Sequence, residues 1–271
     1  MPVDRTADDL LAAVRASPRA VAAHDKDAWV GLFVGNAAVH DPYGSREHIG
    51  RDAISRFYNV FIAPNSIVFQ VDRDLVTGRT VVRDLRIATT MSTGATVTVP
   101  MHLRYDLVES GGAWKIARLA AHWELAVMIR RLLGTGVAGM LAGVKLGPQL
   151  VAELGVGGAM GMMRALRGVG RPGKRVVGRL FGAAAQSDAD RMAALFDAGA
   201  ALELPAGQPV GIAEFAALAR GMRWEKLIAA GRTVSASVRI GAARGVAFVD
   251  FAATSPQVVA VTVFLDRPIA E

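Results

Sequence analysis

Hydrophobic residues recur at helical spacing through the first part of the chain. Residues 6–34 hold two such stretches, "ADDLLAAVRA" and "DKDAWVGLF", and we expect Ser17-Pro18 to break the helix between them. A third amphipathic stretch, "GRDAISRFYNVFIA", ends at Pro64-Asn65. The pattern therefore predicts two or three short helices at the start, followed by one more.

The pattern then changes to strand-like runs. Four of them follow one another: "SIVFQVDRDLV", "RTVVRDLRIATTMS", "TVTVPMHLRYDLVES" and, after a Gly111-Gly112 turn, "AWKIARLAAHWEL". Helices followed by meandering antiparallel strands predict an α+β fold.

Residues 127–182 interrupt this organisation. The segment is rich in Gly, Ala, Leu and Met and shows no alternation of polar and apolar positions. Lys145, Pro148 and Glu153 divide its apolar runs, so we expect closely packed helices rather than a transmembrane helix. The predicted domains are residues 1–126, a helical connector over 127–182, and residues 183–271.

The pattern of the first domain returns after the connector, in an ungapped alignment that places Asp190 on Asp27. In this alignment "VHDPYG" at 39–44 matches "LELPAG" at 202–207, so Leu204 stands where the first copy has Asp41. Three strand-like runs follow in the second copy, which then stops where the first still has "AWKIARLAAHWEL". We predict a degenerate second domain that is truncated by one strand.

Composition limits the classes of protein that the chain can represent. It has 271 residues, 52% hydrophobic and 20% charged, which suits a two-domain globular protein. No cysteine is present, so disulfides, thiolate nucleophiles and cysteine-ligated metals are excluded. The acidic, helix-like start lacks the features of a secretory signal and favours a cytoplasmic location.

The net charge of +7 is concentrated in the connector. Residues 127–182 carry nine basic residues and one acid, whereas all other residues together carry 22 basic and 23 acidic ones. The basic residues over 164–181 allow two interpretations. Their side chains extend into solvent from a helical connector, or they make peripheral contact with the inner face of a membrane. We expect no nucleic-acid partner, because the aromatic residues of a single-strand platform are absent there.

Asp41 is the candidate for chemistry, because the second copy builds the same turn without the acid. The structural alternative is that Asp41 only opens a turn, as Asp before Pro often does. A carboxylate at the mouth of an apolar cavity would lose hydration, and its pKa would rise into the range where it can transfer a proton.

The stretch "WVGLFVGNAAVHDPYG" followed by "GRDAISRFYNVF" resembles the start of the ketosteroid isomerase and nuclear transport factor 2-like superfamily, which includes polyketide cyclase-like proteins. The resemblance covers residues 8–126 well and 184–268 more weakly. It implies two cone-shaped domains, each with helices packed on a curved antiparallel sheet around an apolar pocket. It also implies that the two cones pair within the chain and that a homodimer can form.

The resemblance places Asp41 as the base and Tyr58 as a pocket tyrosine. The chain departs from the family at two positions. The position of the family's oxyanion tyrosine falls on Ser17, and the position of its second acid falls near Met101 or His102. Strict steroid isomerisation is therefore not expected. We predict Asp41, His102 and Tyr58 as catalytic residues, with His102 or Tyr58 as the proton donor.

Polar residues two apart on the strands share a face, directed either into the cone or into solvent. Asp84 and Arg86, His102 and Arg104, and His122 and Glu124 form such pairs. The predicted substrate-binding residues are Tyr43, Trp29, Phe33, Phe57, Phe61, Asp84, Arg104 and Trp123.

The sequence thus predicts an enzyme for a hydrophobic small molecule such as a steroid, terpenoid or polyketide. Asp41 would act as general acid or base in isomerisation, dehydration or epoxide opening, with no cofactor and no metal. The alternative is a non-catalytic lipid or sterol binding protein at a membrane surface.

Overall fold

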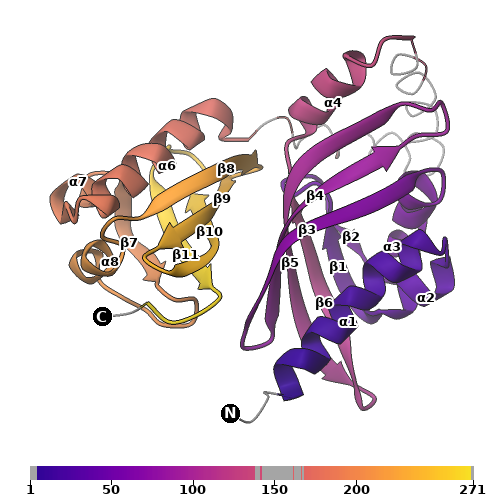
Figure 1. The fold of residues 1–271 in the computed structure, drawn as a ribbon, viewed down its shortest axis with the longest axis horizontal. Coiled ribbons are helices and arrows are strands. Elements are labelled where there is room, and N and C mark those ends of the chain that lie inside the picture. The colour runs from indigo at the N-terminus through magenta and orange to yellow at the C-terminus, as the bar shows by residue number, and fades with distance from the viewer. Residues whose placement is uncertain (1–4, 138–140, 142–160, 162–165, 167, 270–271) are drawn as a thin grey trace. The chain divides into compact units, whose positions relative to one another are not determined.

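The chain forms two compact units in the computed structural model, unit 1 over Met1–Leu166 and unit 2 over Arg167–Glu271 (Figure 1). The structure describes residues 5–137, 141, 161, 166 and 168–269. In each unit helices pack on a sheet, which confirms the predicted α+β class. The boundary falls inside the predicted connector, so both ends of that segment belong to the units themselves.

Unit 1 contains a six-stranded sheet in the order β2-β1-β6-β5-β4-β3. Its elements are α1 (Arg5–Ala22), α2 (Lys26–Gly31), β1 (Phe33–His40), β2 (His48–Ile49), α3 (Arg51–Phe57), the π-helical turn η1 (Tyr58–Ile62), β3 (Ser66–Thr77), β4 (Thr80–Thr90), β5 (Thr96–Ser110), β6 (Ala113–His122) and α4 (Leu125–Leu133). Strands β3 to β6 form the predicted antiparallel meander. Strand β1 was not predicted and pairs parallel to β6, so the carboxyl ends of β1 and β6 lie together.

Helix α1 continues through Ser17-Pro18, where the sequence predicted a break, so Pro18 lies inside the helix. Proline lacks the N–H that would continue the helical hydrogen bonds. The Arg19 guanidinium donates to the Arg15 carbonyl at 3.1 Å and so supplies a donor next to the turn that the proline disturbs. Leu10 and Val14, on the inner side of α1, are fully buried against the sheet.

Unit 2 contains a five-stranded sheet in the order β7-β11-β10-β9-β8. Its elements are α6 (Gly170–Ala185), α7 (Ala189–Ala193), β7 (Phe196–Glu203), α8 (Ile212–Leu218), β8 (Arg223–Ala230), β9 (Thr233–Ile240), β10 (Ala243–Phe251) and β11 (Val258–Leu265). The prediction that the last strand is missing is wrong. Strand β11 pairs antiparallel with β10 and parallel with β7, as β6 pairs with β5 and β1.

Backbone contacts recur between the units at the same relative positions. The Tyr43 amide donates to the Ala121 carbonyl at 2.8 Å, and the Ala206 amide donates to the Val263 carbonyl at 2.7 Å. The Asp41-Pro42 and Leu204-Pro205 peptide bonds are both cis. These contacts align Val263 with Ala121, and therefore β11 with β6.

The helical parts of the units match as well. Asp25 caps α2 by accepting from the Ala28 amide at 2.9 Å, and Asp188 caps α7 by accepting from the Arg191 amide at 3.0 Å. The alignment found in the sequence therefore holds for the helices that precede the turn, which makes α6 the counterpart of α1.

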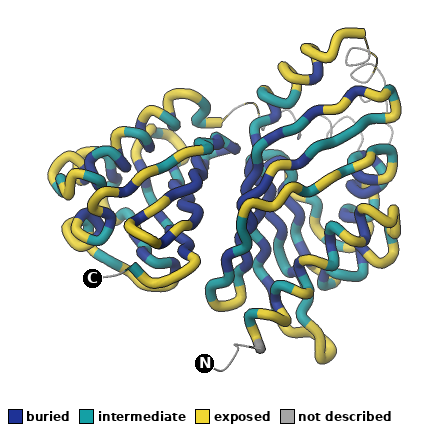
Figure 2. The backbone as a smooth tube through the Cα atoms, viewed as in Figure 1, coloured by how far each residue is buried: buried dark blue, intermediate teal, exposed yellow. Residues whose placement is uncertain are grey.

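Helix α6 is part of the unit 2 core rather than of a connector. Val176, Val177, Leu180 and Phe181 are buried in that core. The dark segments of the backbone tube in Figure 2 mark the buried residues of each unit. The exposed residues on α6 include Arg171, Arg175 and Arg179. The apolar face of α6 is thus occupied, which leaves its arginines for any contact with a membrane; residues 162–165 and 167 lie outside the described part. Within the described residues, no helix is long and apolar enough to cross a membrane.

Candidate active site

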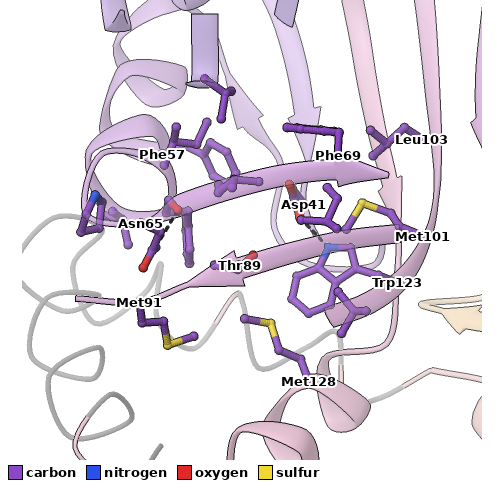
Figure 3. Close-up of a pocket in the computed structure, with 18 of the residues that line it drawn as sticks. Asp41, Phe57, Asn65, Phe69, Thr89, Met91, Met101, Leu103, Trp123 and Met128 are labelled. Carbon is purple, nitrogen blue, oxygen red and sulfur yellow. Dashed lines mark hydrogen bonds between the residues drawn. The ribbon is translucent and has the colours of Figure 1, made fainter. Parts of the chain in front are cut away.

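An apolar cavity of about 200 Å³ lies inside unit 1 (Figure 3). The sheet supplies one side of it through β3, β4, β5 and β6, and α1, α2, α3, η1, α4 and connecting segments supply the rest. Most lining side chains are aliphatic, aromatic or Met. Among the described lining residues, Asp41 is the one that carries a carboxylate. An apolar cavity with a few polar groups is the usual form of a small-molecule site.

Asp41 comes directly after β1, and the pairing of β1 with β6 fixes its position. His40 lies opposite Ala120 in that parallel pair, so the residue that follows β1 reaches the end of β6. There the Trp123 indole Nε1–H donates to Asp41 Oδ1 at 2.6 Å, as the dashed line in Figure 3 shows. One carboxylate oxygen is thereby held in place inside the cavity wall.

The surroundings of Asp41 change its acidity. Burial raises the pKa of Asp41 from 3.8 to about 7, and the hydrogen bond from Trp123 opposes this shift. Burial dominates because the apolar wall replaces water around the charged form. Near neutral pH the carboxyl group therefore exists in both protonation states, as a proton-transfer group requires.

A second polar group lines the cavity between α1 and β5. The Trp29 Nε1–H donates to Ser17 Oγ at 3.0 Å, and the Tyr105 phenol also belongs to the cavity lining. Burial raises the pKa of Tyr105 to about 12. Tyr105 therefore stays protonated at neutral pH and can act only as a neutral hydrogen-bonding group.

Five of the predicted site residues line the cavity. They are Asp41, Trp29, Phe57, Phe61 and Trp123. Trp29 also stacks on Phe57, with ring centroids 6.2 Å apart, so the aromatic side of the cavity is one continuous cluster.

His102, Asp84 and Arg104 do not line the cavity, contrary to the prediction. Met101, Leu103 and Tyr105 are the lining residues of β5, and successive side chains of a strand point to opposite faces. His102 is fully buried on the other face, where its Nε2 lies 3.4 Å from Asp84 Oδ1. Arg104 pairs there with Asp106 at 3.1 Å. These residues belong to a polar cluster behind the sheet.

Tyr58, Tyr43 and Phe33 also lie outside the cavity lining. The Tyr58 hydroxyl is buried with no hydrogen-bond partner among the described residues, and its ring packs 5.6 Å from that of Trp29. Tyr43 stacks on His122 at 4.4 Å. Phe33 packs behind Trp29 at 4.8 Å. Tyr58 therefore cannot serve Asp41 as the predicted proton donor in this structure.

The sequence did not indicate several of the lining residues. Ser17 and Tyr105 were missed as a pair, and Met128 and Leu132 were assigned to the connector although α4 contributes both to the cavity. Strand alternation would have found Tyr105 once Met101 was known to face inward. Leu132 has no such signal, because only the tertiary fold brings α4 to the cavity.

The described residues contain no group of three or more His, Cys, Asp or Glu side chains that could hold a metal ion. The polar groups of the cavity are one carboxylate, hydroxyls, an amide and the indole N–H groups. This set suits hydrogen bonding and proton transfer with an apolar molecule.

The fold and the cavity define unit 1 as an α+β domain that encloses a small-molecule site. Residues 14–119 match the model of the SnoaL-like domain family. The resemblance drawn from the sequence is thereby confirmed for unit 1. No curated protein matches the chain.

Three solved structures that are similar to the chain each cover less than half of it. The Δ5-3-ketosteroid isomerase from Mycobacterium sp. is 24% identical and covers 44% of this chain and 95% of its own, with a TM-score of 0.40. A Mycobacterium tuberculosis protein in complex with estradiol-17β-hemisuccinate is 23% identical, with the same coverage and TM-score. The epoxide hydrolase/cyclase-like enzyme SalBIII is 23% identical and covers 44% of this chain and 93% of its own, with a TM-score of 0.38.

Proposed function

We propose that unit 1 is an enzyme that binds an apolar small molecule and that Asp41 transfers a proton to and from it. The observation that carries the proposal is a single carboxyl group, with its pKa raised to about 7, in the wall of an otherwise apolar cavity. Such a group combines a useful protonation state with a substrate held out of water.

The reaction belongs to the classes that need one acid-base group: double-bond isomerisation, dehydration or epoxide opening. In an isomerisation, Asp41 takes a proton from one carbon and returns it to another. In dehydration it takes a proton from the carbon next to the one that bears the hydroxyl and gives it to the departing hydroxyl, which leaves as water. In epoxide opening it takes a proton from the attacking water and gives it to the ring oxygen as the C–O bond breaks, which leaves a diol.

Unit 2 supports a role for Asp41 beyond building its turn. Leu204 occupies the corresponding position, keeps the same cis peptide bond before proline and is 1% exposed. By the alignment of β11 with β6, Trp123 corresponds to Leu265, which is also buried. The acid and its hydrogen-bond donor are thus replaced together by leucines within the same fold.

The test is the turnover of three probe classes, a β,γ-unsaturated ketone, a β-hydroxy ketone and an epoxide, by the wild type and by Asp41→Asn. We expect the variant to lose at least about 100-fold in kcat on whichever class the wild type accepts. Asp106→Asn is the control, because Asp106 lies behind the sheet with Arg104 and Arg118. Turnover that survives Asp41→Asn contradicts the proposal.

The alternative is a binding protein without catalysis. It is favoured by the 2.6 Å bond between Trp123 and Asp41, which would also satisfy a carboxyl group with a purely structural role. It predicts that apolar probes bind to the cavity and that none of the three classes turns over.

A further inference from the structure

A groove lies on the surface of unit 2 beside α6. One wall comes from α6 and includes Arg175 and Arg179, and the other comes from residues 194–195, before β7, and residues 256–257, before β11. Among the described lining residues, two carry a positive charge, none carries a negative one, and the rest are small or apolar apart from one amide. This basic groove therefore offers an anion two guanidinium groups next to apolar surface.

Three exposed arginines of α6 share one face of the helix. Arg171, Arg175 and Arg179 are four residues apart, which brings successive side chains within about 6 Å of one another. In the described part of the chain none of them forms an ion pair, and Asp188, the next acid along the chain, pairs with Arg191 at 3.1 Å. Like charges at this spacing destabilise a helix, so a bound anion would relieve their repulsion. Guanidinium groups match the oxygens of a phosphate, and one phosphate can bind Arg175 and Arg179 together.

Unit 1 offers a comparison, because the strands that border the groove are paired in the same way in both units. The Leu195 carbonyl accepts from the Val258 amide at 3.0 Å, and the Leu32 carbonyl accepts from the Ile116 amide at 2.9 Å. The residues just before β11 therefore correspond one by one to residues at the start of β6.

Unit 1 fills the corner that is open in unit 2. Trp114 and Lys115 stand where unit 2 has Pro256 and Gln257. Trp114 packs against the core of unit 1, and the Lys115 ammonium donates to the Gly31 carbonyl. The groove thus results from smaller side chains in unit 2 and not from the fold itself.

The three arginines are also specific to unit 2. By the alignment of α6 with α1, they correspond to Asp8, Ala12 and Ala16 of unit 1. The fold forms without these charges, and the charges occur in the copy that has the groove. Their occurrence together indicates a ligand rather than a structural role.

The buried face of α6 limits how unit 2 can bind a membrane. Val177, Leu180 and Phe181 are fully buried in the core of unit 2, so α6 cannot insert its apolar face among acyl chains. Attraction to the charge of lipid headgroups remains, and exposed arginines provide it.

We propose that the basic groove binds the phosphate of an anionic phospholipid and holds unit 2 at a membrane surface. Arg175 and Arg179 bind the phosphate, Arg171 adds to the attraction, and the apolar lining contacts the glycerol and the first carbons of an acyl chain. This inference concerns a second site and does not depend on the cavity of unit 1.

The test is co-sedimentation of the full chain with vesicles at an ionic strength of about 0.1 M. We expect binding to vesicles of equimolar phosphatidylglycerol and phosphatidylcholine, and little binding to phosphatidylcholine alone. Arg175→Gln/Arg179→Gln should lower the partition coefficient about 10- to 30-fold. Equal binding of the wild type to the two kinds of vesicle overturns the inference.

Arg239→Gln/Arg244→Gln is the matched control, because it removes the same charge from the face of the sheet that α6 does not cover. Val238 and Ala243, the neighbours of these arginines along β9 and β10, lie in the core, so the arginines point to the other side. We expect this variant to bind within about twofold of the wild type, because charges more than a Debye length away are screened. An equal loss in the two double variants would mean that binding follows the net charge, which contradicts the assignment to the groove.

Glycerol phosphate distinguishes a lipid from a soluble phosphate compound. At a concentration equal to that of the anionic lipid, we expect it to leave vesicle binding unchanged, because it lacks the acyl chains that contact the apolar lining. Full displacement at that concentration would show that the groove binds small phosphate esters and would contradict docking on a membrane.

Discussion

At the scale of single residues, the chemistry of unit 1 depends on the contrast between one carboxylate and its apolar surroundings. The folded protein raises the pKa of Asp41 from 3.8 to about 7, which means that the fold disfavours the charged form. The same contrast that prepares Asp41 for proton transfer therefore lowers stability once the group ionises.

Asp41→Asn should accordingly stabilise the protein at high pH. Between about pH 4 and pH 7 the folded state binds a proton at Asp41 that the unfolded chain has lost, so wild-type stability falls through this window and the loss is complete above pH 7. A rise in pKa from 3.8 to about 7 corresponds to on the order of 4 kcal/mol. Urea unfolding at pH 4 and pH 8 measures the effect as a growing advantage of the variant. An advantage that does not change with pH would contradict the shifted pKa.

Trp123→Phe should raise the pKa of Asp41 further. The indole N–H stabilises the charged carboxylate, and phenylalanine keeps the apolar wall while removing that donor. The pH at which probe turnover reaches half of its maximum should move upward. A midpoint that stays in place or moves downward would show that the bond does not control the acidity of Asp41.

The comparison of "VHDPYG" with "LELPAG" was sufficient to single out Asp41 from the sequence. Ser17 and Tyr105 could not be found in this way, because only the tertiary fold brings α1 and β5, two elements far apart in the chain, to the same cavity. A residue that acts through a local motif is visible in sequence, whereas one that acts through a long-range contact is not.

At the scale of elements, strand alternation decides which side chains meet the ligand. The sequence shows that His102 and Arg104 share a face of β5, but it does not show which face is inward. The structure places Met101, Leu103 and Tyr105 inward, so the predicted polar pairs lie behind the sheet. A shift of one position along β5 therefore led the prediction to name residues of the outer face of the sheet instead of the residues that line the cavity.

Tyr58→Phe tests the placement of the π-helical turn η1. The hydroxyl is buried without a described partner, and burying such a group costs free energy. Its removal should raise the free energy of unfolding by about 1 kcal/mol, measured by urea unfolding. A decrease of that size would mean that the hydroxyl makes a stabilising bond and that its place in the structure is wrong.

Two strands, β1 and β8, were not predicted from the sequence, because each is irregular. In β8 a register shift lies between Glu225 and Ile228, and Lys226 has a positive φ of 51°. The bulge disrupts the alternation on which strand prediction depends. In β1 a shift between Phe33 and Ala38 has the same effect.

At the scale of the whole molecule, the chain carries two copies of one fold with different interiors. The repeat predicted from sequence reappears in the caps, the turns and the parallel strand pairs of both units. What differs is the polar set around the cavity of unit 1, whose counterparts in unit 2 are aliphatic. Unit 2 therefore serves as an internal reference for which residues the fold itself requires.

Leu204→Asp tests whether the interior of unit 2 accepts an acid at the position of Asp41. Leu204 is 1% exposed, and its neighbours include no counterpart of Trp123, since Leu265 stands there. A carboxylate at this position should lower the free energy of unfolding by about 3 kcal/mol or more at pH 7. Leu204→Met, which keeps an apolar side chain of similar volume, should cost less than about 1.5 kcal/mol. Equal effects of the two substitutions would show that unit 2 accommodates the acid.

The proposed chemistry depends on Asp41, which the protein holds with a pKa suited to proton transfer. The most direct measurement is a ¹³C NMR titration of the Asp41 side-chain carboxyl in the full chain, with the signal assigned by its loss in Asp41→Asn. The structure predicts a midpoint at about pH 7. A midpoint near 4, the ordinary value of an exposed aspartate, would contradict the account.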